Sequence, residues 1–165
     1  MNKIVYITPE QAKVTHAKTI KYSGGGTLEE LDFGKLEGVL YNIQNDDWYP
    51  TFVDKLTHLF FCTCQFHCFA DGNKRLAITL STLFLLQNGY LSIAKTFLSK
   101  TENISLNVAA SKIDKELLHK IMEAINSVDN ASRIVDETLE DIMNDTYDTD
   151  EELKLEIYNS INRKL

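Results

Sequence analysis

The amino-acid sequence predicts a mainly α-helical protein. Only two prolines and seven glycines occur among its 165 residues, so little in the chain interrupts a helix. In several long segments apolar residues recur every three or four positions, the spacing that places them on one helix face. A content of 44% hydrophobic and 25% charged residues is typical of a globular protein with its own core.

The first two elements are expected to be a short extended segment and a helix. Residues 4–7 (Ile-Val-Tyr-Ile) favour a strand or extended entry. Thr8, Pro9 and Gln11 then predict a helix start, because threonine caps, proline suits the first helical position and Gln11 completes a capping box. Three glycines at 24–26 end this helix. Its expected apolar stripe consists of Val14, Ala17 and Ile20.

Three more helices are expected before residue 90. The first covers residues 32–45, and the second starts near residue 50 and runs into a loop at 67–72. The third, residues 73–87, is apolar nearly all round, as a central core helix would be, and Asn-Gly at 88–89 closes it. The apolar residues at helical spacing in the first of these are Leu36, Val39, Leu40 and Ile43.

The C-terminal part is expected to be helical and acidic. Helical spacing predicts helices at 106–127, 130–143 and 151–163. Residues 129–156 hold eleven acidic and two basic side chains, a balance of −9 within a total of −7. The rest of the chain is therefore nearly neutral, which argues against direct nucleic-acid binding. The acidic part is either a protein-interaction segment or a solvated helical face.

We expect a cytoplasmic protein without a membrane segment. The start of the chain has too few apolar residues in a row for a signal peptide. The longest apolar stretch, residues 76–86, contains Thr79, Ser81 and Thr82 and is too short to cross a bilayer. Three cysteines within seven residues of one predicted helix do not form a disulfide framework.

Most of the chemistry lies in residues 67–75, a tight loop that leads into a helix N-terminus. Free N–H groups and the helix dipole make such a place an anion site. Two cationic side chains at this end oppose the helix dipole, and a bound polyanion would explain their presence. A nearby carboxylate favours the binding of Mg²⁺. The alternative is a polar helix start with exposed charges. The polar residues are His67, Asp71, Asn73, Lys74 and Arg75, with Gly72 between them.

This segment resembles the H-x-F-x-D/E-G-N-x-R signature of the Fic/Doc family. The glycines at 24–26 and residues 84–90 extend the similarity toward the Doc-like, death-on-curing branch, over roughly residues 4–95. The resemblance implies a helical bundle around a central motif loop and helix. It implies a catalytic core at 1–110 and an acidic helical extension at 111–165.

The resemblance also implies a role for each motif position. His67 would be the general base that takes the proton of a target hydroxyl. Asp71 would hold Mg²⁺, and Phe69 would pack inward and anchor the loop. The residues expected to bind nucleotide phosphates are Gly72, Asn73, Lys74 and Arg75. Cys68 and Leu76 depart from the residues common in the family, proline and threonine, without removing a functional group.

Lys74 favours one of two chemistries. In the Fic branch this position is commonly glycine and AMP is transferred, whereas lysine in the Doc branch accompanies an inverted ATP and phosphoryl transfer. The resemblance therefore implies a toxin that phosphorylates a Ser, Thr or Tyr hydroxyl, such as one on a translation factor, with AMP transfer as the alternative. The family's inhibitory motif needs Ser or Thr where Phe33 and Leu98 stand, so a separate antitoxin is expected.

Two further alternatives follow from the residues. Cys62, Cys64, His67 and Cys68 suggest zinc, but no second Cys/His cluster supports a tetrahedral site. The second alternative is a non-catalytic binding module of the same fold, and the intact motif argues against this alternative. The remaining histidines have no expected partner and are assigned to packing or surface: His16, His58 and His119.

Overall fold

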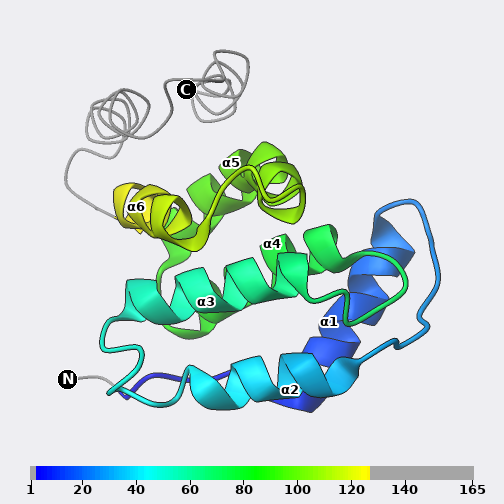
Figure 1. Ribbon diagram of the computed structural model, residues 1–165, viewed down its shortest axis with the longest axis horizontal. Helices are drawn as coiled ribbons and strands as arrows, with labels where there is room; N and C mark the ends of the chain where they lie inside the picture. The colour runs from blue at the N-terminus through cyan, green and yellow to red at the C-terminus, as the bar shows by residue number, and fades with distance from the viewer. Residues whose placement is uncertain (1–2, 127–165) are drawn as a thin grey trace.

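The computed structural model describes residues 3–126, and this part of the chain contains six α-helices and no strand. α3 lies between α2 on one side and α5 and α6 on the other, and α4 packs against α1, α3 and α5 (Figure 1). The mainly α-helical prediction is confirmed. The helices are α1 (Pro9–Tyr22), α2 (Phe33–Asn42), α3 (Phe52–Gln65), α4 (Asn73–Gln87), α5 (Leu91–Ala109) and α6 (Lys115–Asn126).

The extended entry and the first helix start form as predicted. Val5 donates its backbone N–H to Asn88 Oδ1, and Asn88 Nδ2 donates to the Val5 carbonyl, each at 2.9 Å. The Asn88 side chain after α4 thus forms hydrogen bonds with the backbone N–H and carbonyl of Val5, as a neighbouring strand would. At α1, Gln11 N donates to Thr8 Oγ1 and Thr8 N donates to Gln11 Oε1, at 3.2 and 3.0 Å, which completes the capping box.

The apolar stripe predicted for α1 is wrong at Val14 and correct at Ile20. Val14 is 52% exposed, and the helix buries another face, composed of Ala12, His16, Thr19 and Ile20. This face packs toward α4 and the motif loop, where His16 and Thr19 form hydrogen bonds. Two of its four residues are polar, so a search for apolar spacing selects a face that shares only Ile20 with it.

α3 and α4 form the centre of the fold. A second capping box starts α3, where Asp54 N donates to Thr51 Oγ1 and Thr51 N donates to an Asp54 carboxylate oxygen. α4 is buried along most of its length, as its composition predicts. Asn88 and Gly89, at φ +85°, follow α4 and end it as predicted.

The predicted helix at 106–127 is two elements. α5 begins at Leu91 and ends at Ala109, α6 begins at Lys115, and Ser111 in the turn between them has φ +58°. Ile113 lies in this turn yet is fully buried, so the apolar spacing continues although the helix does not. The N-terminal part of α5 escaped prediction because polar residues lie on its buried face, as Thr101 does while donating to the Phe97 carbonyl at 2.9 Å.

α6 packs against α3 through apolar residues and two polar contacts. His119 Nε2 lies 2.8 Å from Asp54 Oδ1, and Lys115 Nζ lies 2.8 Å from His58 Nδ1. Burial and the Lys115 charge lower the pKa of His58 to about 4, so the ring is a neutral acceptor for that lysine. α6 shares the apolar core of the other helices. The domain division at residue 110 stays a prediction.

The remaining predictions for the C-terminal part lie outside the described residues, including the helices at 130–143 and 151–163 and the acidic segment. Within residues 3–126, no helix combines the length and the hydropathy that crossing a bilayer requires.

Candidate active site

The motif loop begins where α3 ends. His67 follows the last residues of α3 in a left-handed conformation, φ +48°, and is exposed. Its imidazole has no hydrogen-bond partner among residues 3–126. A non-glycine residue at positive φ is uncommon and is often held there by its surroundings at functional sites. The conformation leaves the imidazole accessible to a macromolecular substrate.

Asn73 closes the loop from inside. Its Oδ1 accepts from Phe69 N at 3.1 Å, its Nδ2 donates to the Phe69 carbonyl at 2.7 Å, and the residue is buried. Phe69 itself is buried in the core. The two side chains therefore shape the loop, and at most one Nδ2 hydrogen of Asn73 remains for a ligand. The phosphate contact of Asn73 stays a prediction.

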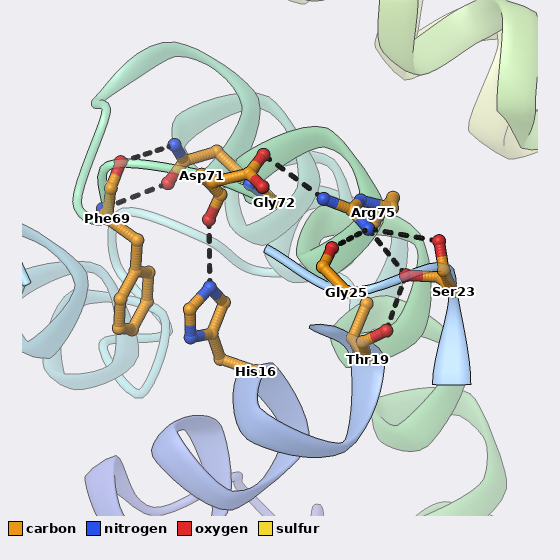
Figure 2. Close-up of polar contacts among 9 residues, drawn as sticks. His16, Thr19, Ser23, Gly25, Phe69, Asp71, Gly72 and Arg75 are labelled. Carbon is orange, nitrogen blue, oxygen red and sulfur yellow. Dashed lines mark hydrogen bonds and ion pairs between the residues drawn. The ribbon is translucent and has the colours of Figure 1, made fainter. Parts of the chain in front are cut away.

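His16 on α1 supports the loop from below (Figure 2). Its Nε2 lies 2.9 Å from the Asp71 carbonyl, and its ring stacks on Phe69 with centroids 3.7 Å apart. The expectation that His16 has no partner is wrong. The buried face of α1 includes residues spaced four apart, Ala12, His16 and Ile20. This spacing is the one feature of the sequence that could have indicated that His16 is buried. His16 is a positioning residue for the loop, because it touches Asp71 and Phe69.

Gly72 lets α1 and the loop approach each other. It is the N-cap of α4 at φ +82°, and a Cβ there would lie 2.6 Å from Ile20 Cδ1 and 3.3 Å from His16 Nε2. Glycine is required by both the backbone conformation and the space. Without a capping side chain, the first N–H groups of α4 have no intrahelical acceptor. This end of α4 suits an anion.

Asp71 and Arg75 lie together at this helix end. Asp71 Oδ1 accepts from Gly72 N at 2.6 Å and from Arg75 at 3.1 Å. Arg75 also donates to Ser23 Oγ at 2.6 Å and to the carbonyls of Ser23 and Gly25, each at 3.3 Å (Figure 2). The guanidinium therefore bridges the motif and the C-terminal end of α1, whose dipole attracts a cation.

The Asp71 carboxylate fits a divalent cation. Its side chain is 44% exposed, and its Oδ2 has no hydrogen-bond donor in the described part of the chain. A half-exposed carboxylate oxygen beside an anion site is a suitable Mg²⁺ ligand, because Mg²⁺ in proteins binds through one or two carboxylates together with phosphate oxygens. Lys74 next to it is exposed, without an ion pair to any residue between 3 and 126.

Residues 27–32 run beside the loop as an extended segment. Ala70 N donates to the Glu29 carbonyl at 2.9 Å, and Leu31 N and Asp32 N donate to the Cys68 carbonyl at 2.9 and 3.1 Å. Glu30 and Phe69 form an isolated antiparallel bridge. These backbone contacts fix one side of the loop. Sequence patterns did not indicate this pairing, because the segment has no strand-like alternation.

The cysteines beside the loop are packed in the core. All three thiols are free and buried, and burial raises the pKa of each, that of Cys62 to about 11. Zinc binding and nucleophilic attack both need a thiolate, which these surroundings disfavour. In residues 3–126, no three His, Cys, Asp or Glu side chains are grouped to hold a metal ion. The cysteines are Cys62, Cys64 and Cys68.

In a comparison with known families, residues 6–85 match the Fic/DOC family. This part of the chain contains the whole candidate site, and over these residues the chain is similar to that family. The family implies AMP transfer, or a related nucleotidyl or phosphoryl transfer, onto proteins. The match does not distinguish the Doc-like branch. A comparison with curated proteins found no match.

Proposed function

We propose that this protein transfers the γ-phosphoryl group of ATP, with Mg²⁺, to a Ser, Thr or Tyr hydroxyl of a target protein in the cytoplasm. The observation that supports this most is the junction of α3, α1 and α4. There the exposed His67 leads into a loop that holds Asp71 and Arg75 against the N-terminus of α4. A base, a metal ligand and an anion site on one short segment suit phosphoryl transfer.

The residues would divide the reaction as follows. Phosphate oxygens would accept hydrogen bonds from the free N–H groups at the start of α4. The Arg75 guanidinium would release the Asp71 carboxylate and bind these phosphate oxygens instead. Asp71 would hold Mg²⁺, which would offset the negative charge of the phosphates. His67 would accept the hydroxyl proton while the target oxygen bonds to the γ-phosphorus. The bond from that phosphorus to the β-phosphate oxygen breaks, and ADP leaves.

AMP transfer by the same site is the second candidate. It places the α-phosphate, not the γ-phosphate, next to His67 and releases pyrophosphate. Lys74 favours phosphoryl transfer, since it adds a full charge and a long side chain at the helix start. A binding module without activity would not require the base, carboxylate and arginine that all remain here.

The proposed biological role is a toxin held inactive by an antitoxin. Phe33 lies buried at the start of α2, and Leu98 is exposed on α5. Neither has the hydroxyl that the family's inhibitory motif uses. A glutamate that occupies the phosphate site would then come from a second protein.

Replacing Asp71 or Arg75 with alanine should weaken Mg·ATP binding and slow transfer. The first change removes the metal ligand, and the second removes the guanidinium that would pair with phosphate. Titration calorimetry with ATP in the presence and absence of EDTA measures both effects. Lys35→Ala is a control, because Lys35 pairs with Asp32 at the surface, at 3.3 Å. Turnover that persists in EDTA would contradict the metal assignment.

Gly26→Ala should impair Mg·ATP binding more than Gly24→Ala. Both glycines have positive φ, +144° and +101°, so both substitutions strain the backbone. Only at Gly26 would the new Cβ meet the site, where it would overlap with Asp71 Oδ2, whereas nothing lies within 4 Å at Gly24. Melting temperatures measure the strain, and calorimetry with Mg·ATP measures the displacement of Asp71. Equal affinity in the two variants would show that Gly26 does not position the carboxylate.

A further inference from the structure

A cavity of ≈ 600 Å³ lies between α1 and α4, on the side of α4 that faces α1. Its walls are largely apolar or aromatic, and the ring of Tyr22 at its edge is 78% exposed. The motif reaction as described above makes no use of it. The lining residues are Glu10, Gln11, Val14, Thr15, Lys18, Thr19, Tyr22, Thr79 and Leu83.

The cavity lies next to the start of α4, because residues in its wall contact or adjoin the partners of Arg75. Thr79, in its wall, lies one helical turn after Arg75 and donates to the Arg75 carbonyl at 3.1 Å. The hydroxyls of Thr19 and Thr79 lie 2.8 Å apart across the two helices. Tyr22 is the neighbour of Ser23, whose hydroxyl binds the Arg75 guanidinium. Arg75 therefore stands between the start of α4 and the cavity.

The threonine hydroxyls inside the cavity are already bonded. The Thr15 hydroxyl donates to the Gln11 carbonyl and the Thr19 hydroxyl to the Thr15 carbonyl, at 2.7 and 2.8 Å. Besides the side chains of Glu10, Gln11 and Lys18, the cavity offers a ligand aliphatic surface at Val14 and Leu83 and the ring of Tyr22. Lys21 Nζ lies 5.3 Å from the centroid of that ring, so the opposite face of the ring is the one open to a ligand. Such a surface suits a flat, largely apolar ring system rather than a charged group.

We propose that this cavity binds the purine base of the nucleotide, an inference that rests on the proposed function. α4 rises about 1.5 Å per residue, so Thr79 and Leu83 lie about 9 and 15 Å along the helix from Asn73. An extended nucleoside triphosphate has a comparable length between its terminal phosphate and its base. With the base on Tyr22, the phosphate chain runs past Arg75 to the start of α4.

This placement fixes the direction of the nucleotide. The phosphate farthest from the base, the γ-phosphate, reaches the end of the site next to the motif loop and His67. The α-phosphate stays near Arg75, away from His67, the general base that would activate the target hydroxyl. The cavity thus supplies a structural reason for phosphoryl transfer, one that is independent of Lys74.

Two variants of the full chain test the base subsite. Tyr22→Ala removes the stacking ring, and Val14→Trp fills the cavity from a half-exposed position. Each should weaken Mg·ATP binding about ten-fold, the loss expected for one base–aromatic contact. Neither should change the binding of Mg·tripolyphosphate, which has no base. Matched controls are Tyr41→Ala and Val5→Trp, since Tyr41 is 77% exposed on α2 and Val5, 50% exposed, lies in a different cavity.

Calorimetric titration of both ligands separates the outcomes. Weaker ATP binding with unchanged tripolyphosphate binding in both cavity variants, and neither effect in the controls, supports the subsite. ATP affinity unchanged in both variants overturns it and leaves the cavity to another occupant, while the proposed function stands. An equal loss for ATP and tripolyphosphate also overturns it, because the cavity would then act on the phosphate site. A wild-type protein that binds neither ligand contradicts the proposed function itself.

Discussion

His67→Ala should lower the rate of transfer by about 10²–10⁴, the contribution of a general base, and leave Mg·ATP affinity nearly unchanged. The imidazole is exposed, and no residue of the described chain forms a hydrogen bond with it, so its loss removes no structural contact. Its proposed partner is the hydroxyl of the target, not the nucleotide. The effect should therefore appear in turnover and not in nucleotide binding.

A second variant separates chemistry from backbone strain. His67 has φ +48°, a conformation that asparagine adopts more readily than alanine. His67→Asn should preserve the loop and the melting temperature yet lose the same activity, because an amide does not accept the proton at neutral pH. Full activity in either variant would contradict the general-base role.

Lys74→Gly should shift the products of the reaction from ADP toward pyrophosphate. The lysine stands in the first turn of α4, exposed, where a phosphate would lie. Glycine removes its charge and its bulk, so the α-phosphate gains room at the helix start. Chromatography of the nucleotide products measures the shift.

Lys74→Met separates the two effects of that change. Methionine keeps most of the length of the side chain and removes its charge. A shift in both variants would assign the orientation of ATP to charge, and a shift in Lys74→Gly alone would assign it to space. If Lys74→Gly still releases ADP alone, Lys74 does not set the orientation.

Local signals predicted the helix starts and the motif well. The capping box predicted at Thr8 starts α1, and the helix start predicted near residue 50 is that of α3, where the structure contains a second capping box at Thr51. These signals lie within four residues, so the sequence displays them directly. The proposed anion site at the start of α4 is local in the same sense, because residues 71–75 would form it.

Contacts between distant segments could not be predicted in this way. Arg75 binds Ser23 and Gly25 across fifty or more positions, and nothing near either segment indicates the pairing. Lys55 is a second example, fully buried with its Nζ 2.9 Å from the Ile43 carbonyl and 2.7 Å from Asp46 Oδ1. A lysine is expected at the surface. Its hydrogen-bond acceptors come from residues 43–46, which follow α2 and fold over this lysine.

The most direct test of the account labels the product. The protein is incubated with Mg²⁺ and a translation extract, with ATP radioactive at either the γ- or the α-phosphate. We expect the γ-label alone to enter a protein, and the intact mass of that protein to rise by about 80 Da, one phosphoryl group. Entry of the α-label, with a rise of about 329 Da for an AMP group, would contradict phosphoryl transfer but not the family chemistry. Incorporation of neither label, together with a His67→Ala variant as toxic to growing cells as wild type, would contradict the enzyme assignment.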